Sequence, residues 1–292
     1  MCNIDSRGGE KPALVERTIM GRRNDVVSDV ACSLALTDDF LSHIPNSSAG
    51  AETTSTTMAW WMLAMVAYPE TQSRAHAELD AAVGRGRVPT FADYPHLPYV
   101  RAMVKEVLRW RPASPFAVPH RTTEDDWYEG MFIPKGTICL PNVWQMNRDP
   151  KIYGSSAAIF DPARHLDKAG GGMESSLSDV MEEGHVTYGF GRRVCVGRYM
   201  ANNSLFIEIA MMLWAANIER KTDASGRPLP LDVDGFVDHG IVMSAGSPCT
   251  CESMADLWCF CCRRPTPFEC EISPRFPEAH ALLAQERELR GL

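Results

Sequence analysis

The sequence predicts a mainly α-helical protein with a minor amount of β-structure. Long, almost wholly apolar stretches over residues 58–68 and 205–218 favour buried helices, and residues 99–110 repeat apolar side chains at helical spacing. Residues 116–142 add short β-prone pieces separated by glycine and proline. Because the chain has 292 residues, 45% of them hydrophobic, it is long enough to bury a sizeable core.

The first clear helices follow one another around Pro69. Residues 1–48 show weak periodicity, and no structure is predicted for them. From about residue 50 the pattern predicts one mostly buried helix that Pro69 ends. Residues 69–84 then predict an amphipathic helix with a glycine stop. Two helices joined at a proline therefore open the predicted fold.

Four further segments complete the prediction. Residues 99–110 predict a third helix, and residues 116–142 predict a small hairpin sheet with a turn at Gly130. A long irregular connection over residues 147–183 is typical of functional or mobile loops. Residues 197–218 predict another long buried helix.

Charge and hydropathy exclude some classes of function. The 29 Lys and Arg residues against 37 Asp and Glu leave a net charge of −8, so no nucleic-acid partner is expected. The chain opens without a secretory signal pattern, and no apolar run reaches the ~18 residues that a membrane span needs. The sequence therefore predicts no membrane anchor, and it leaves the localisation open.

A glycine-rich turn with one cysteine carries the densest chemical signal. Residues 188–197 read YGFGRRVCVG, and Gly189 and Gly191 would let the backbone adopt positive φ and approach a bulky ligand. The pattern predicts that Cys195 lies in the first turn of the following helix, where the helix dipole stabilises a thiolate. Such a sulfur suits metal ligation. The alternative is a buried apolar cysteine after a turn.

Three other motifs occur along the same chain. An acid-threonine segment, GAETT, spans residues 50–54. Glu106 and Arg109 lie three residues apart on one helix face, and Arg164 follows a proline in the FDPAR segment. Taken alone, a Glu–Arg pair at this spacing is usually a solvated surface pair worth a few tenths of a kcal/mol. The order of all four motifs is more informative.

Together these motifs resemble the cytochrome P450 family of haem-thiolate monooxygenases. Members carry an (A/G)Gx(D/E)T(T/S) helix, an ExxR helix, a PERF-like loop and an FxxGxRxCxG cysteine loop, in this order. The four matching segments are residues 50–54, 105–109, 160–164 and 188–197. Tyr188 stands where the family usually has phenylalanine. The resemblance runs over residues 50–243, returns near 265–276, and implies the C-terminal part of the P450 fold, with long haem-flanking helices and small sheets.

The resemblance implies a haem cofactor (iron protoporphyrin IX) and residues that contact it. Cys195 would be the axial thiolate ligand of the haem iron, and Gly197 would belong to the same cofactor-binding loop. Arg193 and His120 match positions that contact haem propionates, where a cation makes charge-assisted hydrogen bonds. For His120 a structural or merely exposed histidine is the alternative. Phe190 would pack near the thiolate and limit access of water.

The resemblance also assigns the acidic and basic residues. Glu106, Arg109 and Arg164 would form a buried cluster that acts as scaffold, because removing one partner strands a charge. Glu52 and Thr53 would lie beside bound dioxygen and relay protons through water. Their alternative is a polar notch or a capped helix N-terminus.

The implied activity is the insertion of one atom of O2 into a small apolar organic substrate. Electrons would come from an NADPH-dependent reductase or another electron donor. One alternative is a truncated, catalytically inactive haem-binding fragment or pseudo-enzyme. Another is a cysteine-rich metal-binding protein, because six of the ten cysteines crowd into residues 249–270. Their spacing has too few Cys-x-x-Cys separations for a good zinc site.

The chain also departs from the family. Members are longer, mostly upstream of Gly50, and the matching motifs suggest a fungal-like eukaryotic member. We expect four segments: an atypical N-terminal segment, a haem-binding core, an irregular cysteine-rich insertion, and a C-terminal β-strand and tail. Their bounds are 1–49, 50–243, 244–262 and 263–292. We interpret the insertion, with parts of the first segment, as translated non-coding sequence.

Overall fold

The computed structural model describes residues 48–167, 183–241 and 260–289. The predicted N-terminal segment and most of the predicted insertion therefore lie outside the described residues. Within those three ranges, no helix combines the length and the apolar character needed to cross a membrane.

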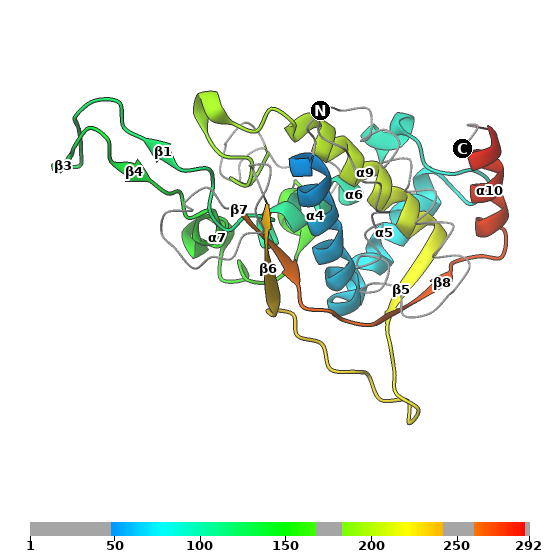
Figure 1. Cartoon of the computed structure of the whole chain (residues 1–292). Helices are drawn as coiled ribbons and strands as arrows, with labels where there is room; N and C mark the ends of the chain where they lie inside the picture. Colours follow the sequence, from blue (N-terminus) through cyan, green and yellow to red (C-terminus); the bar gives the residue numbers. More distant parts are fainter. Residues whose placement is uncertain (1–47, 168–182, 242–259, 290–292) are drawn as a thin grey trace, which may run out of the picture.

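Four helices form the body of the molecule (Figure 1). They are α4 (Ser48–Ala67), α5 (Pro69–Ala82), α6 (Pro98–Trp110) and α9 (Arg198–Ala215). The first three confirm the predicted helices, with Pro69 at the first position of α5, where a proline needs no intrahelical N–H bond. The helices enclose one apolar core, and its largest fully buried side chains include Trp60, Trp61, Trp110, Phe160, Phe206 and Trp214.

Short helices and one further α-helix complete the helical part. The short ones are η1 (Phe91–His96), α7 (Val143–Met146), α8 (Pro150–Tyr153), η2 (Pro162–His165) and η3 (Gly191–Arg193). Near the C-terminus, where we expected only a strand and a tail, α10 (Ala279–Leu289) packs Ala279 and Leu283 into the core.

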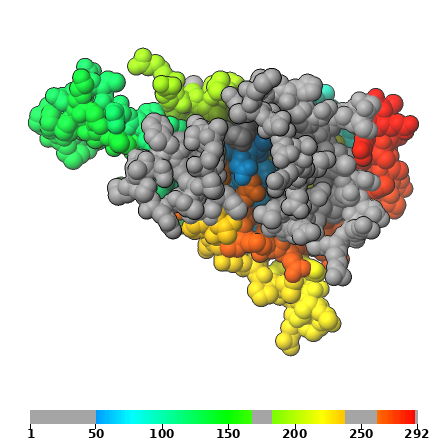
Figure 2. All heavy atoms as spheres, in the orientation of Figure 1, coloured from blue at the N-terminus to red at the C-terminus, as the bar shows by residue number. Residues whose placement is uncertain are grey.

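The predicted hairpin sheet is present as two short strand pairs that form a projecting arm. Strand β1 (His120–Arg121) pairs antiparallel with β4 (Ile138–Cys139), and β2 (Asp126–Tyr128) pairs with β3 (Met131–Ile133). Gly130 turns the chain between β2 and β3 with a φ of 79°. Figure 1 shows the arm standing away from the helices, and Figure 2 shows the same projection in space-filling form.

Two longer strand pairs lie beside the helices. They join β5 (Ala216–Arg220) to β8 (Cys270–Pro274) and β6 (Phe236–Ile241) to β7 (Phe260–Pro265), both antiparallel. The predicted helix over 197–218 is therefore wrong at its end, because pairing with β8 takes the chain into a strand at Ala216. The last three residues of the predicted irregular insertion belong to β7.

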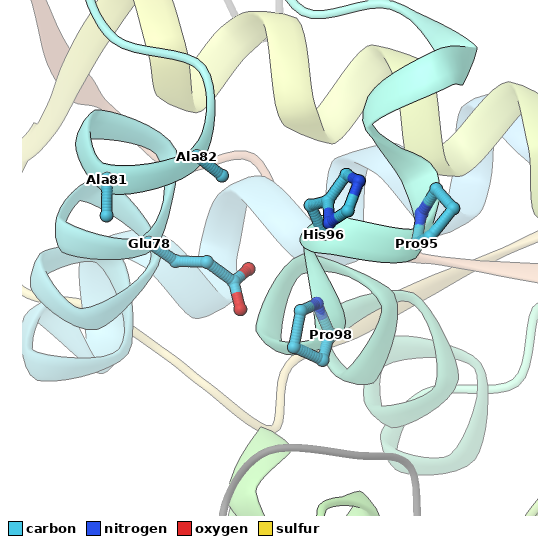
Figure 3. Close-up of a pocket in the computed structure, with 6 residues that line it drawn as sticks. All are labelled: Glu78, Ala81, Ala82, Pro95, His96 and Pro98. Atoms are coloured by element: carbon cyan, nitrogen blue, oxygen red, sulfur yellow. The ribbon is translucent and has the colours of Figure 1, made fainter.

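A carboxylate from α5 caps α6. The side chain of Glu78 accepts the backbone N–H groups of Tyr99 at 2.7 Å and Val100 at 3.0 Å, which satisfies two of the unpaired donors at the start of α6. Burial raises the pKa of the Glu78 carboxyl. An open surface pocket of ≈ 610 Å³ lies here, lined by Glu78, Ala81, Ala82, Pro95, His96 and Pro98 (Figure 3). None of the predicted site residues lines it.

Candidate functional site

The cysteine loop has the backbone that its glycines predict. Gly189 and Gly191 adopt φ values of 79° and 56°, a region that side-chain-bearing residues resist. The backbone N–H of Cys195 donates to the carbonyl oxygen of Tyr188 at 2.8 Å, which closes the loop. No heavy atom lies within 4 Å of the point where a Cβ on either glycine would stand. The loop therefore presents bare backbone beside the cysteine.

The position of Cys195 differs from the prediction in one respect. It precedes the helix rather than lying in its first turn, because Gly197 is the N-cap of α9 and the helix begins at Arg198. The backbone N–H of Arg198 donates to the carbonyl oxygen of Cys195 at 3.4 Å. The alternative of a buried apolar cysteine is wrong, since the Cys195 side chain is exposed.

The donor set at Cys195 fits a haem iron. An exposed thiol beside two glycines leaves room for a bulky ligand, and a porphyrin supplies four nitrogen ligands of its own. Across residues 48–167, 183–241 and 260–289, no group of three or more His, Cys, Asp or Glu side chains could hold a metal ion.

Three other predicted haem-contacting residues lie around this loop and on the arm. Phe190 is half-buried between the two loop glycines, and Arg193 ends η3 with its side chain exposed. His120 lies in β1 opposite Cys139 on the projecting arm, where its side chain is exposed. The roles of Phe190, Arg193, Gly197 and His120 toward haem stay predictions.

The predicted acid–guanidinium cluster is assembled and buried. Glu106 and Arg109 are both 0% exposed, which contradicts the alternative of a solvated surface pair. Two nitrogen atoms of Arg109, Nε and Nη2, each donate to a Glu106 oxygen at 2.7 Å. Arg164 adds a bond from its Nε to Glu106 Oε1 at 3.0 Å. A paired fork of this kind fixes both direction and distance.

A histidine that the sequence reasoning missed completes the cluster. His165, 1% exposed, places its Nε2 2.9 Å from Glu106 Oε2. Because a carboxylate only accepts hydrogen bonds, the ring donates its Nε2–H. Burial alone would raise the pKa of Glu106, but the bonds and charges of Arg109 and His165 outweigh it and lower the pKa to about 2. Position 165 directly follows Arg164, and no spacing rule marks it.

The cluster is linked to the segment that leads into the cysteine loop. Arg109 Nη1 donates to the carbonyl oxygen of Asn147 at 2.7 Å, and the Asn147 side chain bonds both the Thr187 hydroxyl and the backbone N–H of Val186. The Thr187 hydroxyl donates in turn to the carbonyl oxygen of Leu108 at 2.7 Å. Asn147 and Thr187 were not predicted. Their contacts tie α6 to the start of the loop.

The acid-threonine segment lies in the first turns of α4. The Thr53 hydroxyl is 3.3 Å from the carbonyl oxygen of Gly50, and Thr57 donates to the carbonyl oxygen of Thr53 at 2.9 Å. The Glu52 carboxylate accepts from Arg264 Nη2 of β7 at 2.5 Å. Figure 2 shows the start of α4 at the surface beside the residues of β7. Glu52, the acid of the acid-threonine segment, is therefore ion-paired with Arg264 of β7.

Comparison with known proteins agrees with the motifs. A cytochrome P450 family model matches residues 42–230. The chain belongs to the cytochrome P450 family. It is 55% identical over 287 residues to a cytochrome P450 monooxygenase of Armillaria gallica, an alignment that covers 98% of this chain and 50% of that relative. A cytochrome P450 monooxygenase of Postia placenta is 50% identical over 236 residues, covering 81% of this chain and 40% of the relative.

A solved P450 structure supports the fold. A zebrafish cytochrome P450 determined with abiraterone superposes with a TM-score of 0.58 and 30% identity, covering 78% of this chain and 46% of that one. The mainly helical body with small antiparallel sheets is thus a portion of the P450 fold. The chain spans about half the length of the curated relatives it matches.

Proposed function

We propose that this P450 chain holds haem through Cys195 and takes part in the oxygenation of an organic substrate. The observation that carries the proposal is the exposed thiol of Cys195 at the end of a loop whose two glycines leave its backbone bare. Family membership supports the same reaction class. When bound, the haem would activate O2 and transfer one oxygen atom to the substrate.

The chain's own residues would divide the remaining work. Cys195 Sγ would bind the iron, and Arg193 and His120 would pair with the propionates. Thr53 Oγ1 would hold a proton, and the Glu52 carboxyl would receive protons from water and pass them toward that hydroxyl. The buried Glu106 cluster would hold α6 against the segment that leads into the cysteine loop.

A separate electron donor and a small apolar substrate complete the proposed reaction. NADPH-dependent reductase is the donor that the family resemblance favours. The exposed face around Cys195 carries Val196, which is 95% exposed, together with the exposed cation Arg192. An acidic protein partner would complement this face, because opposite charges steer association.

A carbon monoxide difference spectrum tests haem binding. We expect the full chain, expressed with haem supplementation and then reduced, to give the Soret shift of a thiolate-ligated haem. The Cys195→Ala variant should lose that shift, whereas Cys139→Ala, which removes another exposed cysteine, should keep it. Absence of the shift in the unsubstituted chain would rule out a working haem site.

The second candidate is a haem-binding protein without oxygenase activity, the alternative that the sequence left open. Both candidates predict the spectral shift. Reduction of the haem by NADPH and a fungal reductase, followed as the carbon monoxide spectrum that forms without a chemical reductant, separates them, because a working oxygenase must accept electrons from its partner. A normal spectrum without any electron uptake would favour the inactive haem-binding protein.

A further inference from the structure

We propose that Tyr188, Asn202 and Glu183 form a hydrogen-bonded anchor that holds the cysteine loop against α9, with Tyr188 as the positioning residue for Cys195. The inference deepens the proposed function and rests on it for the effect on haem. The anchor itself consists of hydrogen bonds within this chain and does not depend on bound haem.

The three side chains form a directed chain of hydrogen bonds. The Tyr188 hydroxyl donates to Asn202 Oδ1 at 2.7 Å, and Asn202 Nδ2 donates to the two Glu183 oxygens at 3.0 and 3.3 Å. A carboxylate only accepts hydrogen bonds, so Glu183 turns the amide nitrogen of Asn202 toward itself. The amide oxygen is thereby left facing the tyrosine. Glu183 thus fixes the acceptor that Tyr188 needs.

Tyr188 joins this anchor to the cysteine through its own backbone. Its carbonyl oxygen accepts the N–H of Cys195 at 2.8 Å, while its ring lies 5.4 Å from the ring of His185. A phenol carries one O–H donor, and Asn202 Oδ1 is the acceptor that it meets.

The anchor depends on a residue that departs from the family motif. The motif usually has phenylalanine at this position, and a phenyl ring fills the same space without a hydroxyl. Asn202 lies on α9 five residues after the Gly197 N-cap, so the anchor joins the first part of the loop to the helix that follows it. Without the hydroxyl, Cys195 would be connected to α9 by the backbone and by the bond from Arg198 Nη1 to its carbonyl oxygen at 3.3 Å.

Amide hydrogen exchange on the full chain without haem tests the anchor directly. Loss of one neutral hydrogen bond, ~0.5–1.5 kcal/mol, corresponds to roughly a 2- to 12-fold faster exchange of the Cys195 amide. We expect this increase in Tyr188→Phe and in Asn202→Ala. The matched controls are Tyr128→Phe, on the exposed arm, and Asn203→Ala, the exposed neighbour on α9; neither should change the rate.

A Cys195 amide that exchanges at the same rate in all four variants would overturn the proposal. Far-UV circular dichroism identifies a variant that fails to fold, and Tyr188→Phe, which deletes a single oxygen atom, is the safeguard if Asn202→Ala does so. An equal increase in the two controls would likewise overturn it, because the loop would then respond to any substitution.

The haem-loaded chain gives the second readout. We expect Tyr188→Phe and Asn202→Ala to convert from the thiolate to the neutral-thiol carbon monoxide spectrum several-fold faster than the two controls. Equal conversion rates would overturn the role of the anchor toward haem. If the unsubstituted chain shows no thiolate spectrum, the proposed function fails, whereas the exchange rates still decide whether the anchor exists.

Discussion

The Glu106 cluster and the Cys195 loop share one helical body but differ in almost every physical respect. Glu106 and its partners Arg109 and His165 are buried, and Arg109 holds the carboxylate through a bidentate pair of hydrogen bonds. Cys195 is exposed on a loop that uses glycine geometry instead of packing. The charged groups of the Glu106 cluster therefore stabilise the fold. The sulfur of Cys195, by contrast, lies exposed at the surface. Substitutions in the Glu106 cluster should therefore lower the stability of the fold, whereas substitution of Cys195 should abolish haem ligation and leave the stability unchanged.

The largest expected effect on stability comes from Glu106→Gln. It removes the charge that two guanidiniums share, one 0% and the other 7% exposed in the side chain, and leaves them uncompensated in the interior. We expect a loss of ~3–5 kcal/mol in the free energy of unfolding. Urea denaturation followed by circular dichroism measures it.

The matched control is Glu70→Gln, which neutralises an exposed carboxylate in the first turn of α5. It should change the free energy of unfolding by less than ~0.5 kcal/mol. Equal losses in the two variants would contradict the view of the Glu106 cluster as the scaffold.

A smaller effect is expected from acid acting on the partly buried His76. Burial, aided by the positive charge of Arg275, lowers the pKa of His76 to about 4. The unfolded chain, with a pKa near ~6.5, binds this proton more tightly. Stability that is present above pH 6.5 is therefore lost as the pH falls through 4. Because His76 is only partly buried, we expect a loss of ~1–2 kcal/mol.

Melting temperatures measured between pH 7 and 4 check the histidine. His76→Gln should flatten the acid side of the profile, because the group that takes up the proton is gone. The same substitution at the exposed His96 serves as the control and should leave the profile unchanged. An unaltered profile in His76→Gln would show that other groups carry the acid dependence.

A still smaller stability effect is expected at the ion pair of Glu52 with Arg264. The two side chains are 38% and 21% exposed, so solvent screens the pair. We expect Arg264→Gln to cost less than ~1 kcal/mol of unfolding free energy. A double-mutant cycle with Glu52→Gln measures the coupling. Strictly additive losses would mean that the pair contributes nothing.

The two regions also differ in how well the sequence predicts them. Pro69, the apolar period of α6 and the glycines at 189 and 191 act locally, so their consequences could be derived from the residues themselves. His165 and Thr187 act through contacts with residues 59 and 79 positions away, and no local pattern reveals such partners.

Long-range pairing explains the remaining differences. The helix predicted through residue 218 ends at Ala215, because β8, more than 50 residues later, offers a pairing partner. Helix α10 was not predicted for a related reason, since its apolar residues are buried only by packing against a core formed by distant parts of the chain. The glycine-rich cysteine loop was predicted correctly, but Cys195 was placed in the first turn of α9, whereas it precedes the helix.

The central claim is that Cys195 binds the haem iron and contributes nothing to the stability of the fold. One pair of measurements on Cys195→Ala tests it most directly. We predict that the haem-loaded variant loses the thiolate carbon monoxide spectrum, while the free energy of unfolding of the haem-free chain changes by less than ~0.5 kcal/mol. A thiolate spectrum that survives the substitution, or a loss of stability as large as that of Glu106→Gln, would contradict the account.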